Sequence, residues 1–423
     1  MKFVLDSGVI EIMDIINNDG YSCYLVGGAV RDYVIGNVAK DFDLCTDMPL
    51  DVVKEKIPQI IIMKENSHRN TGIIKMNGYC YEISAFRGNS LEEDLFNRDF
   101  CMNAMAIDRS GNLIDPYNGY LSINNKVVSL IDSSGSAFVT DPLRILRAIR
   151  QSYELGFTID DNCLRQMDLN KSLLCEVASE RVYDEFKKIL LFDNASDLLY
   201  RHKNILFEII PELSRCDGFI QNNDYHIYDV LGHILKVVEN TKSDLVLRLA
   251  ALFHDIGKPD RYVVDDKGVG HFYGHPGVSC EIFKKFANKY KVDNKTKRVV
   301  CKLILEHENQ LSGKSNKIYD FYKRFGLDNV EELFFLKRAD ALGQSPKYLD
   351  RLDKYDELLE KYLDVRDTLK NISVDGNDLI GVGITGKKIK DVLDYVNLAV
   401  VCGQVKNEKQ EILAFIKRKY LGK

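Results

Sequence analysis

The spacing of apolar residues changes near residue 140 and predicts two kinds of structure along the chain. Before that point, short apolar runs bounded by Gly, Asn or Asp are typical of strands, and a short helix is predicted over 29–35. The predicted strands cover 21–26, 41–44, 72–76 and 79–83. Asn77-Gly78 lies between the last two and predicts a hairpin turn. From Asp141 onward, apolar residues recur every three or four positions, which predicts helices.

The apolar stripe of the first helix in this second part consists of Leu143, Ile145, Leu146 and Ile149. Further helices are predicted over 180–192, 228–239 and 245–256. The fold class is therefore predicted to be α+β, with a mixed first part followed by helices. Stretches rich in Ser, Gly, Asn and Asp, and a Ser-Pro pair near 345, predict the domain boundaries. The resulting domains are 1–135, 136–216, 217–345 and 346–423.

Composition narrows the class of protein. The 423 residues are 45% hydrophobic and 29% charged, which is typical of an ordered globular protein. No apolar run reaches about 18 residues, so a membrane span is not expected. Acidic residues at positions 6 and 11 argue against a signal peptide, and ten scattered cysteines without a Cys-x-x-Cys pair favour the cytoplasm. The net charge of -5 means that any nucleic-acid surface has to be a local basic patch.

The first candidate site combines a glycine turn with a pair of carboxylates. Gly27-Gly28 ends a predicted strand and opens a helix, so its backbone N–H groups and the helix end suit a phosphate, to which Arg31 can add a contact. Asp41 and Asp43 alternate along a strand and therefore point to one face. Glu82, on another predicted strand, offers a third oxygen ligand. Mg²⁺ prefers such oxygen ligands together with substrate phosphates, so this pattern indicates phosphoryl or nucleotidyl transfer.

Several motifs, in order, resemble those of class II CCA-adding enzymes and bacterial poly(A) polymerases, which belong to the polymerase β nucleotidyltransferase superfamily. The resemblance covers roughly the first half of the chain. Asn97 and Thr140 depart from it, since the family usually has Arg and Glu there. The matching segments are 27–32 with 41–43, Arg98-Asp99-Phe100-Cys101-Met102-Asn103-Ala104, Asp141-Pro142-Leu143-Arg144 with the arginines that follow, and Glu180-Arg181 through Lys188.

The resemblance implies a polymerase β-like nucleotidyltransferase head, a helical neck, a helical body and a helical tail. It also implies a role for each matching residue. Asp41 and Asp43 would bind Mg²⁺, and Gly27, Gly28, Arg31 and Asp32 would hold the triphosphate. Arg98, Asp99 and Asn103 would contact ribose or phosphate. Asp141 and Arg144 would select the base of CTP or ATP without a nucleic-acid template, and Arg147 and Arg150 complete the predicted nucleotide-binding set.

A second candidate site consists of histidines, six of which fall between residues 226 and 307. Imidazole and carboxylate groups are good ligands for divalent transition metals. The order His233, His254-Asp255, Asp340 resembles the HD phosphohydrolase domain, over roughly 225–345. His275 and His307 extend the set toward a second metal or a phosphate contact. The resemblance implies a metal site here, with hydrolysis as an alternative role.

The C-terminal part is locally basic and resembles the tail of the same enzymes. A Gly-rich turn at 381–386 leads into a predicted helix that begins with three lysines, and the chain ends in a further basic run. Such a surface suits an RNA backbone. The leading hypothesis is a Mg²⁺-dependent enzyme that adds CCA to tRNA from CTP and ATP and releases pyrophosphate. The alternatives are CC-only or A-only addition, poly(A) synthesis, an HD hydrolase with a degenerate head, and an RNA-binding protein without catalysis. Oligomeric state is left open.

Overall fold

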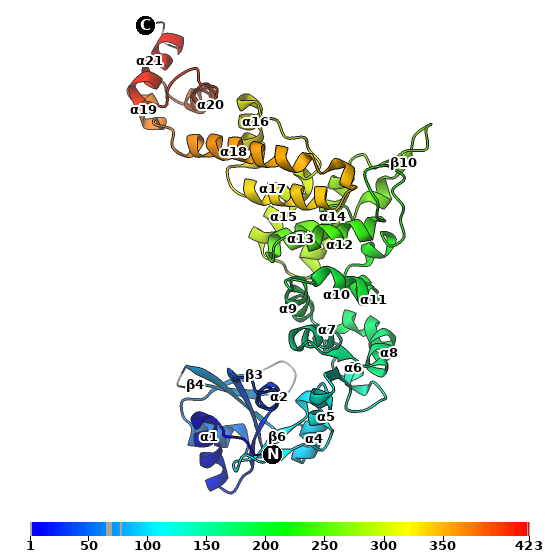
Figure 1. Ribbon diagram of the computed structural model, residues 1–423. Coiled ribbons are helices and arrows are strands. Elements are labelled where there is room, and N and C mark those ends of the chain that lie inside the picture. The colour runs from blue at the N-terminus through cyan, green and yellow to red at the C-terminus, as the bar shows by residue number, and fades with distance from the viewer. Residues whose placement is uncertain (1, 65–69, 77, 421, 423) are drawn as a thin grey trace. The chain divides into compact units, whose positions relative to one another are not determined.

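The computed structural model describes residues 2–64, 70–76, 78–420 and 422 (Figure 1). The described chain divides into two compact units, 1–189 and 190–423. The first unit holds a sheet and helices, and the second is helical apart from one two-residue strand pair. The predicted α+β class and the mixed-then-helical order are therefore confirmed. The three predicted domain boundaries stay a prediction.

Unit 1 contains a seven-stranded mixed sheet in the order β3-β4-β5-β2-β1-β6-β7. The four predicted strands are all present, whereas β3, β6 and β7 were not predicted; the turn at Asn77 lies outside the described residues. The central pair β2 and β5 is parallel, and their neighbours are antiparallel. The strands are β1 (Cys23–Val26), β2 (Asp41–Thr46), β3 (Ile61–Lys64), β4 (Asn70–Met76), β5 (Tyr79–Ala85), β6 (Ala106–Ile107) and β7 (Leu113–Ile114).

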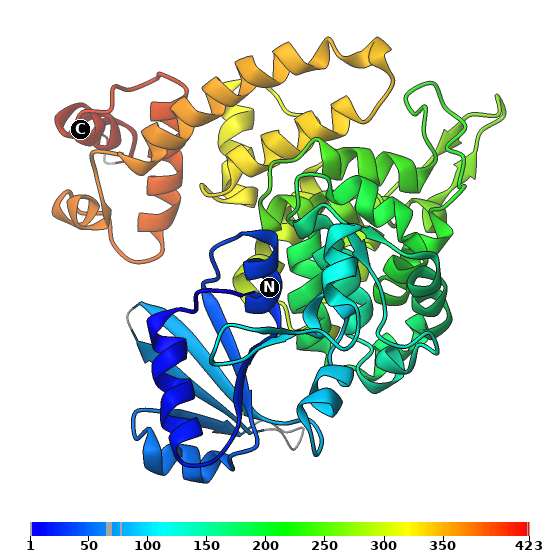
Figure 2. The ribbon, with the colours of Figure 1, turned by 60° about the horizontal axis from the view of Figure 1, so that its bottom comes forward.

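One face of this sheet is apolar and lies against α1 (Ser7–Asn18), as Figure 2 shows. Phe42 and Tyr81 point to this face and stack with ring centroids 5.3 Å apart. A Cβ on Gly8 would lie 2.3 Å from the Tyr81 hydroxyl, so the helix packs directly on that ring. Because successive side chains of a strand point to opposite faces, the residues flanking Phe42 and Tyr81 point away from α1. This alternation places Asp41, Asp43 and Glu82 on the other face.

The rest of unit 1 is mostly helical. α2 begins directly after β1 and ends at Gly36, whose φ of +87° is the left-handed conformation that closes a helix. The predicted apolar stripe of α7 is buried, as expected. The helices are α2 (Gly28–Ile35), α3 (Leu50–Lys56), α4 (Leu91–Phe96), α5 (Gly119–Asn124), α6 (Ser136–Thr140), α7 (Arg144–Leu155), α8 (Asp161–Asn170) and α9 (Ser179–Leu190); 3₁₀ turns cover Cys101–Asn103 and Lys171–Glu176, and β8 (Val127–Val128) pairs with β9 (Thr158–Ile159).

Unit 2 is organised around α13, which is buried from Leu247 to Phe253 because it packs against α12, α14, α15 and α17. The tail has its own apolar cluster, which includes Leu379, Val396 and Ile416. The helices are α10 (Ala195–Arg201), α11 (Lys203–Ile209), α12 (Val230–Glu239), α13 (Leu245–Phe253), α14 (His275–Lys289), α15 (Asn294–Glu306), α16 (Ser315–Phe325), α17 (Val330–Leu342), α18 (Arg351–Lys370), α19 (Gly376–Gly381), α20 (Lys388–Val401) and α21 (Lys409–Tyr420). 3₁₀ turns cover Pro211–Arg215, Lys258–Arg261 and Pro346–Tyr348, and the strand pair is β10 (Val263–Val264) with β11 (Gly270–His271). Within the described parts of the chain, no helix combines the length and apolar character needed to cross a lipid bilayer.

Candidate active site and metal centre

Three carboxylates share one face of the unit 1 sheet. Asp43 on β2 is the direct register partner of Glu82 on β5, and Asp41 lies two residues before Asp43. Burial raises the pKa of Asp43, and the charge of Asp41 raises it further, while Arg98 and Arg87 lower it. Carboxylates that share one face repel each other, and a divalent cation removes that repulsion. This oxygen donor set fits the Mg²⁺ that the sequence predicts.

The glycine turn touches this carboxylate group directly. Gly27 has φ +72°, which disfavours residues with a side chain. A Cβ at Gly27 would lie 2.9 Å from Asp43 Oδ2 and 3.2 Å from a terminal nitrogen of Arg98. Gly28 begins α2. A Cβ at Gly28 would lie 3.5 Å from a terminal nitrogen of the Arg31 guanidinium. The turn therefore brings backbone N–H groups, a helix end and a guanidinium beside the carboxylates, as phosphate binding requires.

A chain of hydrogen bonds joins α2 to α7 through the segment after α4. Arg31 contacts Asp32 at 2.9 Å and donates to Asn103 Oδ1 at 3.0 Å. Asn103 in turn donates to Asp99 at 2.8 Å, and Asp99 accepts two bonds from Arg147, at 2.6 and 3.1 Å. Burial raises the pKa of Asp99, but Arg147 and Asn103 outweigh it and hold the pKa well below its usual value. Five predicted nucleotide-binding residues thus form one connected network.

Gln151 on α7 belongs to the same network and was missed by the sequence analysis. Its side chain is buried, accepts a bond from Asn103 at 2.9 Å and donates to Asp99 at 3.3 Å. With its amide oxygen bound to Arg31 and its amide nitrogen to Asp99 and Gln151, Asn103 has a single orientation. The signal in the sequence is weak, because a Gln on a predicted helix does not indicate which residues it contacts.

Arg98 is held by Asp94, a second residue that the sequence analysis missed. The two residues are four positions apart and form two bonds, at 2.8 and 3.0 Å, with both side chains buried. Burial lowers the pKa of Arg98, but Asp94 outweighs this effect and raises it. Asn97, which departs from the family pattern, contributes its backbone oxygen to Arg144 at 2.7 Å and to Arg87 at 3.2 Å.

The proposed base-selecting pair lies at the start of α7. Arg144 is buried, and it donates to the backbone oxygens of Asn97 and Ala137. Asp141 lies 3.4 Å from Arg181, and 31% of its side chain is exposed. Further along α7, Arg150 binds Glu185 at 2.6 Å and Glu154 at 2.7 Å, so it joins α7 to α9. Arg144 is thus held by backbone oxygens, whereas Asp141 and Arg150 form ion pairs with residues of α9.

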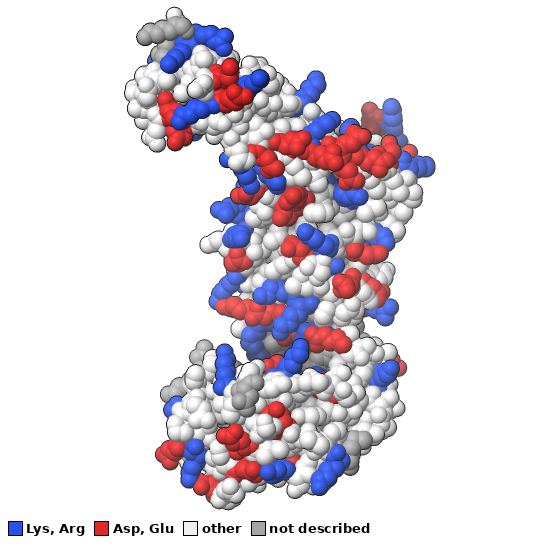
Figure 3. Space-filling view, turned by 60° about the vertical axis from the view of Figure 1, so that its left-hand side comes forward, with Lys and Arg blue, Asp and Glu red and all other residues white. Residues whose placement is uncertain are grey.

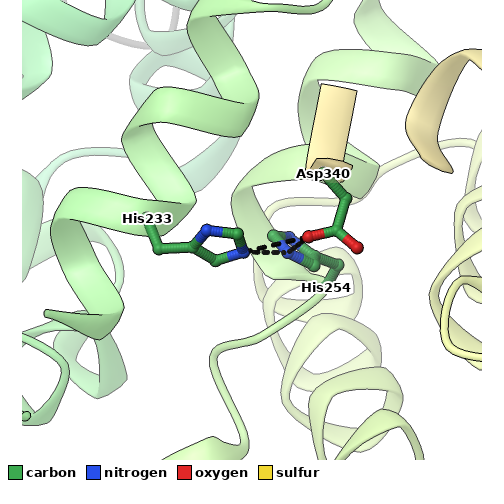
Figure 4. A group of neighbouring side chains, drawn as sticks. All are labelled: His233, His254 and Asp340. Carbon is green, nitrogen blue, oxygen red and sulfur yellow. Dashed lines mark hydrogen bonds and ion pairs between the residues drawn. The ribbon is translucent and has the colours of Figure 1, made fainter. Parts of the chain in front are cut away.

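In unit 2, the four predicted HD residues converge from three parts of the chain. His233 lies on α12, His254 follows α13 and Asp340 lies on α17 (Figure 4). Asp255 is the residue after His254. His233 Nε2 is 3.2 Å from Asp255 and 3.1 Å from Asp340, and His254 Nε2 is 3.2 Å from Asp255. Burial lowers the pKa of His233, but hydrogen bonds to Asp255 and Asp340 outweigh it and raise it to about 9. The two carboxylates thus favour positive charge at the centre of the cluster.

The orientation of the imidazoles fits metal binding. In each of four histidines, Nδ1 lies against a backbone oxygen: that of Gly343 for His233 and that of Ala251 for His254, at 3.1 and 2.7 Å. His275 and His307 repeat the arrangement with the oxygens of Phe272 and Ile304. An Nδ1–H donated to a carbonyl leaves the Nε2 lone pair for a metal. Three of these oxygens lie three residues before their histidine.

His275 and His307 extend the cluster on the other side of Asp255. His275 Nε2 is 2.9 Å and His307 Nε2 is 3.5 Å from Asp255 Oδ1, whereas His233 and His254 contact Oδ2. Two groups of donors result, each with its atoms within 4.8 Å of one another: His233, His254 and Asp340, and His254, Asp255 and His307. Imidazole with carboxylate is a donor set for divalent transition metals, and a carboxylate with ligands on both oxygens suits two ions.

Lys258 is a further residue of this centre that the sequence analysis did not select. It is buried, and its Nζ lies 2.6 Å from Asp255 Oδ2 and 2.8 Å from Gln221 Oε1. The available signal was its position three residues after Asp255 on the same turn. Lys337 is also buried nearby, and burial lowers its pKa to about 8. Its Nζ donates hydrogen bonds to the backbone oxygens of His307 and Asn309.

Three family models match consecutive parts of the chain. The model described as the poly A polymerase head domain matches residues 23–129. The one described as a probable RNA and SrmB-binding site of polymerase A matches 156–216. The HD domain model matches 223–344. The order of these matches follows the order of the motifs.

Individual proteins of known identity resemble most of the chain. A CCA-adding enzyme of Geobacillus sp. is 26% identical over 421 residues, covering 95% of this chain and 94% of the relative. The crystal structure of the Bacillus stearothermophilus CCA-adding enzyme in complex with CTP matches with a TM-score of 0.66 at 24% identity. The match covers 98% of this chain and 97% of that chain. The Thermotoga maritima CCA-adding enzyme complexed with tRNA matches with a TM-score of 0.64 at 20% identity. The match covers 98% of this chain and 96% of that chain. These structures show the fold.

One relative exceeds these in identity. A CC-adding tRNA nucleotidyltransferase of Halalkalibacterium halodurans is 31% identical over 278 residues, covering 61% of this chain and 72% of the relative. This relative agrees with the resemblance found in the motifs. The three family models and the carboxylates on the sheet agree with it as well. The chain therefore belongs to the family of CCA-adding enzymes and bacterial poly(A) polymerases, and it is a nucleotidyltransferase.

Proposed function

We propose that this enzyme adds CCA to the 3′ end of tRNA from CTP and ATP, without a nucleic-acid template. The observation that carries the proposal is the register of Asp41, Asp43 and Glu82 beside the Gly27-Gly28 turn. Relatives that match nearly the whole length of the chain are CCA-adding enzymes, which favours complete CCA addition. The shorter match to a CC-adding enzyme defines the main alternative.

Asp41 and Asp43, with Glu82, are the residues that would hold Mg²⁺. When bound, Mg²⁺ neutralises the charge of a nucleoside triphosphate and favours attack at its α-phosphorus. Arg31 and the N–H groups of the glycine turn bind and orient the triphosphate. The terminal ribose hydroxyl of tRNA forms a new O–P bond, the bond to the bridging α–β oxygen breaks, the hydroxyl proton is lost to solvent and pyrophosphate leaves.

Asp141 and Arg144 are proposed to select the incoming base. An aspartate accepts a bond from the exocyclic amino group that both C and A carry, and a guanidinium donates to a ring nitrogen or a carbonyl. Arg144 is held by two backbone oxygens, so its side chain starts from a defined position. Asp141 is partly exposed and contacts Arg181 at 3.4 Å. Fixed side chains can discriminate between bases where flexible ones cannot.

The acceptor end of tRNA is proposed to bind by shape and through its phosphates, which is how proteins recognise A-form RNA. Lysines at the start of α20 and basic residues at the end of α21 are the proposed contacts in the tail. On the face drawn in Figure 3, basic and acidic side chains are interspersed. On a surface with both signs of charge, we expect individual basic side chains to contact RNA phosphates, and we do not expect one broad basic patch to bind the RNA.

The decisive experiment offers the purified protein a tRNA that lacks its 3′ CCA, with CTP alone, ATP alone or both. We expect addition of CC with CTP alone and of CCA with both, read as discrete products on a sequencing gel. Products that stop at CC with both nucleotides would favour the CC-adding alternative. A long A tract on unrelated RNA would favour poly(A) synthesis.

A second experiment tests the metal assignment. Asp41→Ala and Asp43→Ala are expected to reduce nucleotide addition at least about a thousandfold, since the carboxylates hold the ion that the reaction needs. Asp51→Ala, on the exposed surface of α3, is the matched control and is expected to leave addition unchanged. Addition that persisted in the first two variants would mean that the metal assignment is wrong.

Base selection is tested by Asp141→Ala and Arg144→Ala, assayed with CTP and ATP in competition. We expect the preference between the two nucleotides to change by more than the overall rate of transfer, because these side chains contact the base and not the reacting phosphate. Equal losses for both nucleotides, with the preference intact, would contradict the selecting role.

A second activity, hydrolysis of phosphate esters, is proposed for the histidine cluster of unit 2. His233, His254, Asp255 and Asp340 would hold a divalent transition metal, and His275 and His307 would complete a second position. Such an ion, when bound, supplies an activated water at neutral pH. Phosphatase activity is expected to require added transition metal and to vanish in His254→Ala. Retention of metal-dependent hydrolysis in that variant would contradict the assignment.

The enzyme is proposed to work in the cytoplasm. All ten cysteines are free in the structure, and seven of them are buried. Unpaired cysteines at this density suit a reducing compartment.

A further inference from the structure

A cavity of about 760 Å³ opens in unit 1 beside Asp41, and Lys75 on β4 lines it as well. Across the sheet, Asp41 on β2 pairs with Cys80 on β5, and Cys80 pairs with Lys75. Residues that pair directly on neighbouring strands point to the same face. Lys75 is exposed and therefore shares the face of the metal-binding carboxylates, with its Cα two strand spacings, or about 10 Å, from that of Asp41.

Apolar side chains continue the same face toward the edge of the sheet. Glu82 on β5 pairs with Ile73 on β4, and Ile73 pairs with Ile61 on β3, which is the last strand on this side. Met63 lies two residues after Ile61 on β3 and so points the same way. Ile61 is 66% and Met63 52% exposed. An apolar contact here would remove the flat face of a nucleobase from water.

The geometry of the reaction indicates what lies over this part of the sheet. The glycine turn and Arg31, which bind the triphosphate, follow β1, and β1 lies on the opposite side of β2 from β5 and β4. In phosphoryl transfer the attacking and leaving oxygens lie roughly in line on opposite sides of the phosphorus. The attacking 3′ end of the RNA therefore approaches from the side of β5 and β4, where Lys75 lies. Its last phosphate is one nucleotide away from the attacking hydroxyl, which suits a cation two strands from Asp41.

We propose that Lys75 binds the phosphate between the last two nucleotides of the tRNA, and that Ile61 and Met63 contact its terminal bases. The proposal rests on the nucleotide addition proposed above and adds the residues that position the attacking hydroxyl. Lys75 is a positioning residue, because its ammonium group donates to phosphate oxygens and takes no part in bond formation. A phosphate contact carries no sequence information. It therefore suits a 3′ end whose last nucleotide changes with each addition.

The first test measures steady-state kinetics of the full chain on a tRNA that lacks CCA. Lys75→Ala is expected to raise the KM for tRNA about tenfold and to leave the KM for CTP unchanged, because only the RNA loses a charge-assisted contact. The slope of log KM for tRNA against log salt concentration is expected to fall by about one. Lys75→Arg is expected to keep the parent values. Lys56→Ala, which removes an exposed lysine of α3 that pairs with Asp19, is the matched control.

The second test identifies the phosphate. A tRNA minihelix carries an uncharged methylphosphonate at its last linkage, and kcat/KM is measured for the parent and for Lys75→Ala. The parent is expected to lose about tenfold on the modified RNA, and Lys75→Ala to lose nothing further, because the contact is already absent. Losses that multiply in the combination would overturn the assignment of Lys75 to this phosphate.

The third test concerns the apolar contact. Ile61→Asp places a negative charge beside the RNA and is expected to raise the KM for tRNA about tenfold, with the KM for CTP unchanged. Val4→Asp, at another highly exposed apolar residue of unit 1, is the control and is expected to behave as the parent does. An unchanged KM for tRNA in Ile61→Asp would overturn the contact with the bases.

The outcomes separate this inference from the proposed function. A parent protein that adds no nucleotide would contradict the proposed function, and this inference with it. Normal addition by the parent, with the KM for tRNA unchanged in Lys75→Ala, would overturn only the role of Lys75. An equal rise in the KM for tRNA and for CTP, or altered thermal unfolding of Lys75→Ala but not of Lys75→Arg, would show a structural role and overturn the positioning role.

Discussion

At the scale of single residues, Gly27 shows how the backbone conformation and the site depend on each other. Its φ of +72° and its contact with Asp43 both exclude a side chain. Gly27→Ala is expected to reduce nucleotide addition at least about a hundredfold, because the added methyl displaces the Asp43 carboxylate. The backbone strain contributes about 1–3 kcal/mol of lost stability.

Gly36 provides a matched control for that prediction. It has φ +87°, but a Cβ there would meet nothing within 4 Å. Gly36→Ala is therefore expected to lose about 1–2 kcal/mol of unfolding free energy from its left-handed conformation while it keeps its rate of nucleotide addition. Parallel assays of unfolding and addition distinguish strain from interference. Equal rates for the two variants would show that the contact between Gly27 and Asp43 is unimportant.

Gln151 is expected to position the triphosphate-binding side chains through Asn103. Gln151→Leu removes the acceptor of one Asn103 bond and so loosens the amide that holds Arg31. We expect the KM for both nucleotides to rise about tenfold with a smaller change in kcat, since ground-state binding is affected first. Steady-state kinetics on a tRNA that lacks CCA give the two constants. An unchanged KM would rule out the positioning role.

His202 is expected to make unit 2 sensitive to acid. Burial, helped by the charge of Arg201, lowers its pKa to about 4 from an unfolded value near 6.5. A lowered histidine pKa means that the unfolded chain binds the proton more readily, so stability falls as the pH drops from about 6.5 to 4 and levels off below. The loss is on the order of 1–3 kcal/mol.

His202→Gln is expected to remove this pH-dependent loss. The measurement is the free energy of unfolding of both proteins at several pH values between 4 and 8. The difference between variant and parent should change within that window and be constant above pH 7. A difference that does not vary with pH would contradict the assignment.

At the scale of elements, α13 depends on Arg248, which is buried in an otherwise apolar helix. Its guanidinium donates to the backbone oxygens of Lys242, Leu190 and Phe192. Arg248→Leu leaves these buried acceptors without their donor and is expected to cost about 3 kcal/mol or more. Denaturant unfolding measures the cost. Arg201→Leu, whose exposed side chain pairs only with Asp197 in the contacts described, should change stability by less than about 1 kcal/mol.

The elements that the sequence predicted are those with a sustained period or a strong end signal. α2 and α9 lie close to their predicted bounds, and β2 and β5 alternate apolar and polar residues as expected. β6 to β11 escaped prediction because two residues carry no period. β3 escaped because its apolar run, unlike β2, does not alternate.

The candidate sites divide in a similar way. Asp41 with Asp43, and His254 with Asp255, are neighbours in the sequence, so local reasoning reaches them. Gln151 and Lys337 act through partners that only tertiary packing brings near, and Asp94 pairs with Arg98 only four residues later. Their residue types are common on solvated helix faces, and nothing in the local sequence distinguishes them from ordinary solvent-exposed residues.

At the scale of the whole molecule, the two candidate sites lie in different compact units. Asp43→Ala is therefore expected to leave metal binding by the histidine cluster intact, and Asp340→Asn to leave CCA addition intact. Calorimetric titration with Mn²⁺ and the addition assay on both variants give the four results. Loss of addition in Asp340→Asn, in a protein that still folds, would show that the cluster serves the transferase.

Metal binding is also expected to stabilise the protein. A ligand that binds only the folded state at about one hundred times its Kd adds about 2.7 kcal/mol. Thermal unfolding of the parent should thus shift upward with Mn²⁺, and the shift should be absent in Asp340→Asn. An equal shift in both proteins would place the stabilising ion elsewhere.

The backbone oxygens that face the imidazoles have a consequence for how the metal centre varies between relatives. His254, His275 and His307 each rest on the oxygen three residues earlier, which every amino acid supplies. Exchange of the residue that provides this oxygen cannot remove the hydrogen-bond acceptor. The ring orientations can therefore be kept when many of the surrounding residues are substituted. The metal centre is lost chiefly when one of its ligands is replaced.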